Sequence, residues 1–156
     1  MNSHLDKIDT RILAIVQEDA SLTAAEIGDR VGLSQAACWK RIKRLENDGV
    51  IQKRVAILAP EKIGLRTLIL VHVKLSAHGR ANLDEFTEKI RSMPKVLECY
   101  VLLGNEDFFL KIAVADIYEY EQFFFRELSS IEGVAEIRSS VTLSQIKDTT
   151  AYPLPI

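Results

Sequence analysis

The sequence predicts an α+β protein built in two parts, because the spacing of its apolar residues changes along the chain. Before Pro60 the apolar residues recur every three or four positions, as they do on helices. After Arg66, alternating stretches typical of half-buried strands stand between further helical stretches. Basic residues also cluster on the last of the early helices. We therefore predict an N-terminal winged helix-turn-helix followed by a ferredoxin-like βαββαβ domain.

Capping residues mark the first two helices of the N-terminal part. Asp6 is a plausible N-cap for a helix that runs to about Asp19 with an apolar stripe. Thr23 and Glu26 have the spacing of a capping box, which begins a second helix. Gly32 is well placed to end that helix in a left-handed conformation.

A third helix is expected from Ser34, as its cap, to about Asp48. At 100° per residue its inward face consists of Cys38, Ile42 and Leu45, and its outward face of Ala36, Lys40 and Lys43. The stretch 50–58 has strand character and carries two basic residues, as a wing beside a phosphate backbone would. Ala59 and Pro60 then begin a hinge, because proline cannot continue a strand ladder.

The C-terminal part shows the order strand, helix, strand, strand, helix, strand. The expected strands are residues 66–75, 96–103, 108–114 and 134–143, and the second and third are joined by a turn at 104–107. Two helical stripes lie between them: Leu83, Phe86, Ile90 and Met93, then Ile117, Tyr120, Phe124, Leu128 and Ile131. We thus expect a DNA-binding domain at 1–58, a hinge at 59–65 and a ferredoxin-like domain at 66–156. Both helices would cover one face of the sheet, so a second copy covering the other face predicts a homodimer. The tail after Ile146 is expected to lie across a partner or an edge strand.

Composition and charge narrow the possible functions. The 156 residues carry a formal net charge of −2, but residues 1–62 have a net charge of +1 and the remainder −3, so the whole-chain value hides a local basic face. The cysteines, Cys38 and Cys99, are far apart; we expect each to be buried in packing, with no disulfide and no metal site. No apolar run approaches the roughly 18–20 residues of a membrane span. With no apolar signal region at its start, the protein is expected in the cytoplasm. No cofactor motif or nucleophile–base arrangement is evident, and no catalytic residue is assigned.

Five separated stretches resemble the Lrp/AsnC family of feast/famine regulators. They are LDKIDTRIL (5–13), VGLSQAACWKRIKRLENDGVI (31–51), PEKIG (60–64), VLECYVLLGNEDFFL (96–110) and GVAEIRSSVTL (133–143). Their order along the chain makes the resemblance more specific than any one of them. It implies a regulator of transcription that binds double-stranded DNA and forms homodimers, which in the family often assemble into octamers. It also implies a small effector, usually an amino acid, bound in the C-terminal domain.

The candidate DNA contacts follow the third helix and the wing. Cationic side chains there would displace the counterions condensed on phosphates, and Gln35 is the best candidate for reading adenine through its amide. Ser34 is more readily explained as a cap, and Trp39 could pack on a DNA sugar or on the first helix. The candidate set is Ser34, Gln35, Ala36, Trp39, Lys40, Arg41, Lys43, Arg44, Lys53 and Arg54.

The family resemblance places the effector at the turn between the second and third strands of the C-terminal domain. The matching residues are Gly104, Asn105, Glu106 and Asp107, with Ser139 and Ser140 on the last strand. A zwitterionic amino acid needs an acceptor for its ammonium group, which Asp107 or Glu106 could supply. It also needs donors for its carboxylate, which backbone N–H groups and a serine hydroxyl could supply.

Two other functions are compatible with this fold. Siroheme decarboxylases resemble it but carry a degenerate helix-turn-helix; the intact basic third helix and the lack of an evident histidine pair argue against an enzyme of that kind. An architectural protein that binds DNA without a ligand is the second alternative.

Overall fold

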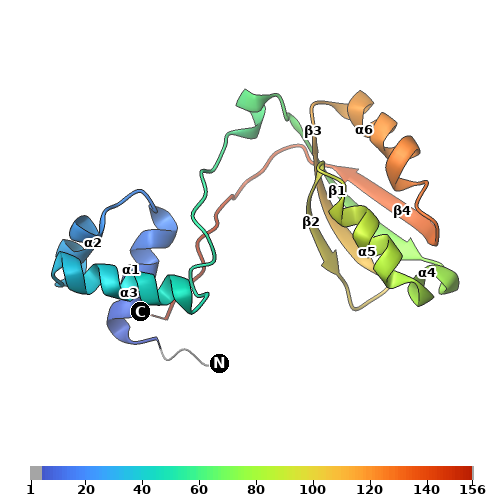
Figure 1. The fold of residues 1–156 in the computed structure, drawn as a ribbon. Coiled ribbons are helices and arrows are strands. Elements are labelled where there is room, and N and C mark those ends of the chain that lie inside the picture. The colour runs from blue at the N-terminus through green and yellow to red at the C-terminus, as the bar shows by residue number, and fades with distance from the viewer. Residues whose placement is uncertain (1–4, 156) are drawn as a thin grey trace. The chain divides into compact units, whose positions relative to one another are not determined.

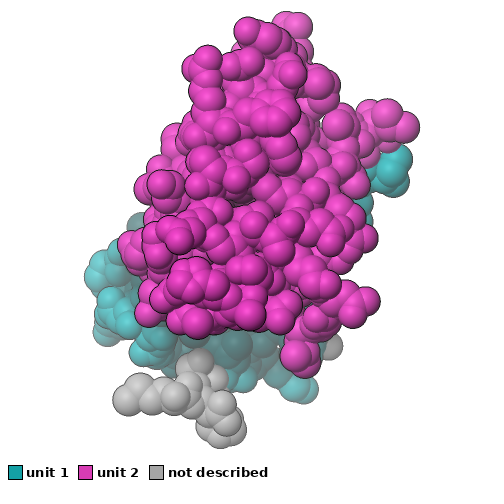
Figure 2. Space-filling view, turned by 90° about the vertical axis from the view of Figure 1, so that its right-hand side faces the viewer, with its two compact units in different colours: residues 1–57, 146–156 teal, residues 58–145 magenta. Residues whose placement is uncertain are grey.

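The computed structural model describes residues 5–155. The chain divides into two compact units, coloured separately in Figure 2. The first, here called the N-terminal unit, comprises the residues up to 57 together with the tail from 146. The second, the C-terminal unit, comprises residues 58–145. No helix among the described residues is both long and apolar enough to span a membrane.

Three helices form the N-terminal unit: α1 (Lys7–Glu18), α2 (Ala24–Val31) and α3 (Gln35–Asn47) (Figure 1). Their starts confirm the predicted caps, because Asp6 and Thr23 each form a capping box and Ser34 accepts a hydrogen bond from the N–H of Ala37. The left-handed φ of +76° at Gly32 ends α2. The next residues can therefore turn directly into α3.

The core of the N-terminal unit is made by one face of each helix. Ile12 and Ile27 are fully buried against the predicted inward face of α3, which consists of Cys38, Ile42 and Leu45. Burial raises the pKa of the Cys38 thiol, which keeps it protonated and unreactive. Full burial of each aliphatic side chain contributes about 1.5–3 kcal/mol of transfer free energy. Because the inward face of α3 supplies this burial, the outward face is not needed for packing.

The predicted strand over 50–58 is wrong. Residues 52–58 are exposed and belong to no strand, because none of the described segments forms a hydrogen-bonded ladder with them. Strand propensity needs a partner strand, and this chain alone does not provide one. Lys53 and Arg54 therefore lie on an exposed connecting segment. It leads to the 3₁₀ helix η1 (Pro60–Ile63), which ends at Gly64 with a φ of +89°.

The tail packs within the N-terminal unit rather than on a strand edge. The Gln17 side-chain amide of α1 donates to the carbonyl oxygen of Tyr152, and its oxygen accepts from the Tyr152 N–H, both at 3.0 Å. The two bonds pair a side-chain amide with a peptide group as two strands would pair. They fix residue 152 against α1.

The C-terminal unit is a four-stranded antiparallel sheet with helices, which confirms the predicted ferredoxin-like domain. Its strands are β1 (Thr67–Leu75), β2 (Val96–Val101), β3 (Phe108–Val114) and β4 (Val134–Val141), in the spatial order β2-β3-β1-β4. The connecting helices are α4 (Ala77–Ala81), α5 (Leu83–Arg91) and α6 (Ile117–Phe123), and the last continues into the π-helical turn η2 (Phe124–Leu128).

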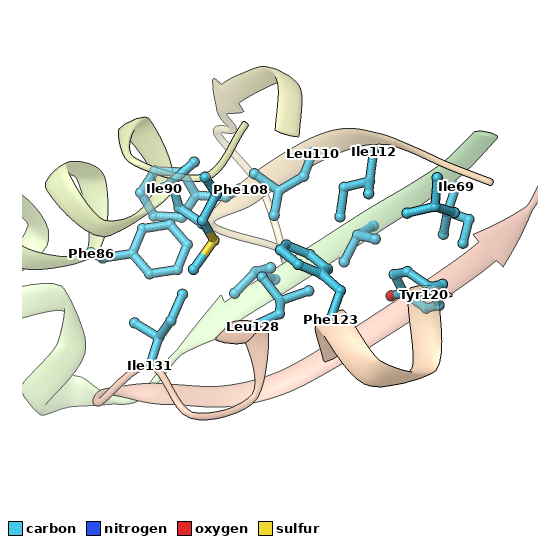
Figure 3. Close-up of a cluster of buried hydrophobic side chains, with 14 of the residues drawn as sticks. Ile69, Phe86, Ile90, Phe108, Leu110, Ile112, Tyr120, Phe123, Leu128 and Ile131 are labelled. Carbon is cyan, nitrogen blue, oxygen red and sulfur yellow. The ribbon is translucent and has the colours of Figure 1, made fainter. Parts of the chain in front are cut away.

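Both long helices cover the same face of this sheet. Ile69 of β1 and Leu110 of β3 lie in one cluster with Phe86 of α5 and Phe123 of α6 (Figure 3). The alternate residues of these strands face the other way, so Leu70, His72 and Phe109 lie on a face that no described helix covers. His72 packs edge-on to Phe109 on this open face.

A π-helical turn changes the apolar stripe predicted for the second long helix. Ser129 donates its N–H to the carbonyl of Phe124, five residues back, and the wider turn places Phe123 and Leu128 on the buried face. Phe123, which the regular helical spacing missed, is 2% exposed, and Phe124 is only partly buried. The predicted stripe members Ile117 and Leu83 are also exposed, because each lies at the first residue of its helix.

The edge strand β2 corrects the expectation for Cys99. We expected this thiol to be buried, but it is exposed, as are Leu97 and Val101 on the same strand. Alternation identifies which residues share a face, but it does not show whether anything covers that face at the edge of a sheet.

Candidate nucleic-acid interface and effector site

The predicted DNA contacts lie mostly on the exposed side of α3. This side presents Ser34, Gln35, Ala36, Trp39, Lys40, Lys43 and Arg44, and Lys53 and Arg54 are exposed on the segment that follows. Arg41 is half-buried. The outward face predicted from helical periodicity is therefore confirmed as exposed surface, and Gln35 lies on it in the first turn of the helix.

Two of the predicted contacts are ion-paired to α1. Arg41 donates to Asp6 at 2.6 Å and to Asp9 at 2.8 Å, and Arg44 donates to the other oxygen of Asp9. The hydrogen bonds that Arg41 donates, first to Asp6 and then to Asp9, raise the pKa of its guanidinium, which keeps it charged. Part of the positive charge of α3 is thus compensated within the chain.

A third acidic residue, Glu46, compensates two more of the cations. It binds Lys43 at 2.7 Å and Arg54 at 3.2 Å, and these partners, Lys43 first, hold the pKa of its carboxyl below the usual value. Within the part of the chain that the structure describes, Lys40 and Lys53 form no ion pair. These two lysines are therefore the uncompensated cations of the candidate interface.

Trp39 lines a groove between α3 and the start of α2. The side chain is 53% exposed, and the groove, of about 400 Å³, is also lined by Leu22, Ile42 and Arg54. The residues that line this groove come from α3, from the start of α2 and from the segments beside them. An exposed aromatic ring beside lysine and arginine side chains suits contact with the sugars of a nucleic-acid strand.

The candidate effector site is the turn between β2 and β3, where Gly104 and Asn105 are exposed. Asp107, which ends this turn, accepts the N–H of Leu75 at 2.7 Å and the Nε–H of Arg80 at 3.1 Å. The Leu75 N–H and then Arg80 lower the pKa of the Asp107 carboxyl. The turn is thus joined to the end of β1, at the point where the β1–β4 register shifts.

The other predicted effector residues do not converge on Asp107. Glu106 is ion-paired with Arg138 of β4. Ser139 shares a hydrogen bond with the hydroxyl of Tyr120, on the face that α6 covers. Ser140, one residue further along the strand, lies on the opposite face. The two serines therefore cannot both reach one ligand on one side of the sheet.

Sequence reasoning missed two residues that organise these sites. They are Asp9, in the first turn of α1, and Arg80, in α4. Both interactions join residues 27 or more positions apart, so no local spacing could reveal them. No group of three His, Cys, Asp or Glu side chains able to hold a metal ion occurs among residues 5–155.

Two family models match the chain, one in its N-terminal part and one in its C-terminal part. Residues 5–52 match the family model of a winged helix-turn-helix DNA-binding domain, and residues 68–152 match that of the Lrp/AsnC ligand-binding domain. The curated relatives include the DNA-binding transcriptional activator DecR of Escherichia coli, 38% identical over 150 residues, with 96% of this chain and 99% of that protein aligned. The glutamate uptake regulatory protein of Zymomonas mobilis is 38% identical over 151 residues, which cover 97% of this chain and 92% of the relative.

Solved structures of transcriptional regulators superpose on nearly the whole chain. The transcriptional regulator NMB0573 of Neisseria meningitidis, in complex with L-Met, superposes with a TM-score of 0.91 at 35% identity, covering 96% of each chain. An AsnC family transcriptional regulator of Agrobacterium tumefaciens superposes with a TM-score of 0.90 at 38% identity, covering 95% of this chain and 96% of the other.

A helix-turn-helix joined to a ligand-binding domain defines the class of ligand-responsive transcriptional regulators. The chain has both parts, in that order. It belongs to the Lrp/AsnC family, and it is a DNA-binding transcriptional regulator with a ligand-binding domain.

Proposed function

We propose that this regulator binds double-stranded DNA through the outward face of α3 and responds to an amino acid bound at the β2–β3 turn. The observation that carries the DNA part is the exposed row of Gln35, Trp39 and Lys40 on the second helix of a helix-turn-helix. Phosphate contacts from Lys40 and Lys53 would supply affinity, and Gln35 would contact base edges. We place the protein in the cytoplasm and assign it no catalytic step, in keeping with relatives that are named as regulators.

The DNA contact can be followed through Trp39, because it is the protein's one tryptophan. Adding a DNA duplex should quench or shift its fluorescence. Lys40→Glu should raise the DNA concentration needed for half of that response by about tenfold or more, since it converts an attraction to phosphate into a repulsion. Lys62→Glu makes the same change on the exposed η1 and should have little effect. Equal weakening by both variants would contradict docking through α3.

The effector part rests on the Arg80–Asp107 pair. Arg80 is half exposed and Asp107 less so, and together they present a guanidinium and a carboxylate 3.1 Å apart beside the turn. These are the two charges that complement the carboxylate and the ammonium of an α-amino acid. A relative is named for glutamate uptake, and a structural neighbour binds L-Met, which supports the amino-acid class without identifying the ligand of this chain.

A thermal-unfolding screen against the common amino acids tests this assignment. A ligand at about a hundred times its dissociation constant adds roughly 2.7 kcal/mol to the free energy of unfolding. Arg80→Gln should abolish the shift, while Arg91→Gln, which breaks an exposed ion pair of α5, should preserve it. A shift that survives Arg80→Gln would contradict the position of the site. A screen without any shift would contradict the amino-acid class.

We further propose a homodimer in which a second copy covers the open face of the sheet. Leu70, His72 and Phe109 are only half-buried there, and Tyr100 extends the aromatic surface to the edge strand. Light scattering during size-exclusion chromatography should give at least twice the monomer mass, and octamers would be seen in the same experiment. Phe109→Lys should shift the mass towards the monomer, whereas Tyr118→Lys on exposed α6 should not. A monomeric unmodified protein would refute the proposal.

A further inference from the structure

Asp9 is a buried carboxylate with two arginine partners. Its side chain is 1% exposed, and it accepts hydrogen bonds from the backbone N–H of Asp6, from Arg41 and from Arg44. Both arginines belong to α3, whose outward side is the proposed DNA-binding face. The carboxylate therefore joins the first helix of the N-terminal unit to the helix that is proposed to contact DNA.

The two arginines differ in what they can still offer to a ligand. Arg41 is 27% exposed and is held by both Asp6 and Asp9 through one terminal nitrogen. Arg44 is 48% exposed and is held by Asp9 through one terminal nitrogen, with Asp9 as its one ion-pair partner among the described residues. A guanidinium carries five N–H donors in a rigid plane, so a contact at one nitrogen fixes its orientation and leaves the other donors unused.

We propose that Asp9 is a positioning residue for DNA binding: it orients the guanidinium of Arg44 so that the remaining N–H donors meet one DNA phosphate. The proposal rests on the proposed function of α3. A lysine or a free arginine would attract phosphate anywhere along the backbone. A guanidinium anchored from behind accepts a phosphate at one position, and phosphate contacts of fixed geometry set the register of a protein on its duplex.

A positioning role and a purely electrostatic role of Asp9 predict opposite changes in DNA affinity when its charge is removed. Asp9→Asn removes a negative charge close to the DNA-binding face. If Asp9 were only a nearby charge, its removal should tighten binding to every duplex. If Asp9 positions Arg44, the same substitution should weaken binding to the preferred duplex, because the guanidinium then loses its fixed orientation.

The experiment compares two duplexes: one that the unmodified protein selects from a random pool, and a scrambled version of it. For Asp9→Asn we expect about a tenfold loss of affinity for the selected duplex, the effect of one charge-assisted hydrogen bond of roughly 1.4 kcal/mol. Affinity for the scrambled duplex should stay the same or rise, so the ratio between the two should fall. Asp9→Asn that binds the selected duplex as tightly as, or more tightly than, the unmodified protein would overturn the proposal.

Two further variants separate positioning from folding and from charge. Arg44→Lys keeps the charge but loses the planar group, so it should lower the ratio as Asp9→Asn does, and the double variant should lose little more than either single one. Glu46→Gln removes an acidic residue from the same surface and should raise the affinity for both duplexes. Two outcomes would show that Asp9 has no positioning role. One is that Arg44→Lys leaves the ratio of the two duplex affinities unchanged. The other is that Glu46→Gln lowers this ratio as far as Asp9→Asn does.

Circular dichroism at the binding temperature confirms that each variant is folded. If Asp9→Asn is unfolded, the proposal is tested by the effect of Arg44→Lys on the ratio of the two duplex affinities. An unmodified protein that selects no duplex contradicts the proposed DNA binding itself. A protein that selects one, with a ratio insensitive to Asp9→Asn, contradicts only the role of Asp9.

Discussion

Asp107 shows how one carboxylate can hold a turn in place. One of its oxygens accepts the N–H of Leu75, and Arg80 approaches both oxygens. Its own N–H donates to the carbonyl of Val73 at 3.0 Å. The residue that the sequence offered as a ligand acceptor thus also closes the end of β1, and a substitution there changes stability as well as any ligand response.

Asp107→Ala should lower the free energy of unfolding by about 1–3 kcal/mol near pH 7, because it leaves the Leu75 N–H without its acceptor. The folded-state pKa of Asp107 lies below the ordinary value of 3.8. The stabilisation is therefore complete above that value and is lost as the pH falls through the folded-state pKa. Urea unfolding at about pH 7 and about pH 2.5 should show the gap between the variant and the unmodified protein narrowing in acid.

The matched control is Glu121→Gln, on the exposed side of α6, which should leave the free energy of unfolding within about 0.5 kcal/mol at both pH values. A gap between Asp107→Ala and the unmodified protein that widens in acid would contradict the hydrogen-bond assignment.

At the residue scale, the sequence was sufficient to predict those roles that depend on residues a few positions away along the chain. The caps Asp6, Thr23 and Ser34 and the buried face of α3 follow from spacings of three or four positions, and all are confirmed. The exposure of the candidate DNA contacts follows in the same way. The pairing of Lys43 with Glu46 also has such a local spacing. The role of Asp9 could not be found in this way, because its partners Arg41 and Arg44 lie 32 and 35 positions further along the chain.

At the scale of elements, every predicted helix is present, and the departures come from context. The π-turn after Phe123 shifts the apolar stripe by one position, and a regular 100° periodicity cannot represent it. The segment 50–58 has strand composition but no partner strand. Cys99 lies opposite the buried Leu110 of β3, but its side chain is exposed because β2 is the edge strand of the sheet.

The contact between α4 and the loop before β4 gives an element-scale prediction. A Cβ atom on Gly79 would lie 2.4 Å from the carbonyl oxygen of Gly133, whose own φ of +85° is left-handed. Helix propensity alone says that Gly79→Ala gains about 1 kcal/mol. We expect a loss of about 1–3 kcal/mol instead, because two backbone segments must separate.

Chemical unfolding of Gly79→Ala measures the sign of this change directly. Gly104→Ala, which meets nothing within 4 Å and has no left-handed φ, is the control and should be close to neutral. A more stable Gly79→Ala would show that the two glycines do not touch.

On the scale of the whole molecule, the chain enters the N-terminal unit twice. It leaves after residue 57 and returns at residue 146, so two segments connect the units. The return is fastened by the paired hydrogen bonds between Gln17 and Tyr152. The sequence predicted that this tail lies across a partner or an edge strand, whereas it is bound to α1 through a contact that spans 135 residues.

Gln17→Ala should release the tail, because it removes both hydrogen bonds at once. Trypsin should then cleave after the exposed Lys147 several-fold faster, as expected when local opening becomes easier. Mass spectrometry of the early fragments gives the rate. Glu18→Ala, the neighbouring substitution at an exposed residue, is the control, and equal cleavage rates for the two variants would contradict the docking of the tail to Gln17.

The formal net charge of −2 hides the basic outward face of α3, so the most direct test of DNA binding through this face is the salt dependence of DNA affinity. For the unmodified protein, the logarithm of the affinity should fall linearly with the logarithm of the salt concentration. Lys40→Ala should flatten that slope by about 0.9 for each protomer on the duplex, the effect of one lost phosphate contact. An unchanged slope in Lys40→Ala would contradict the docking of α3 against DNA.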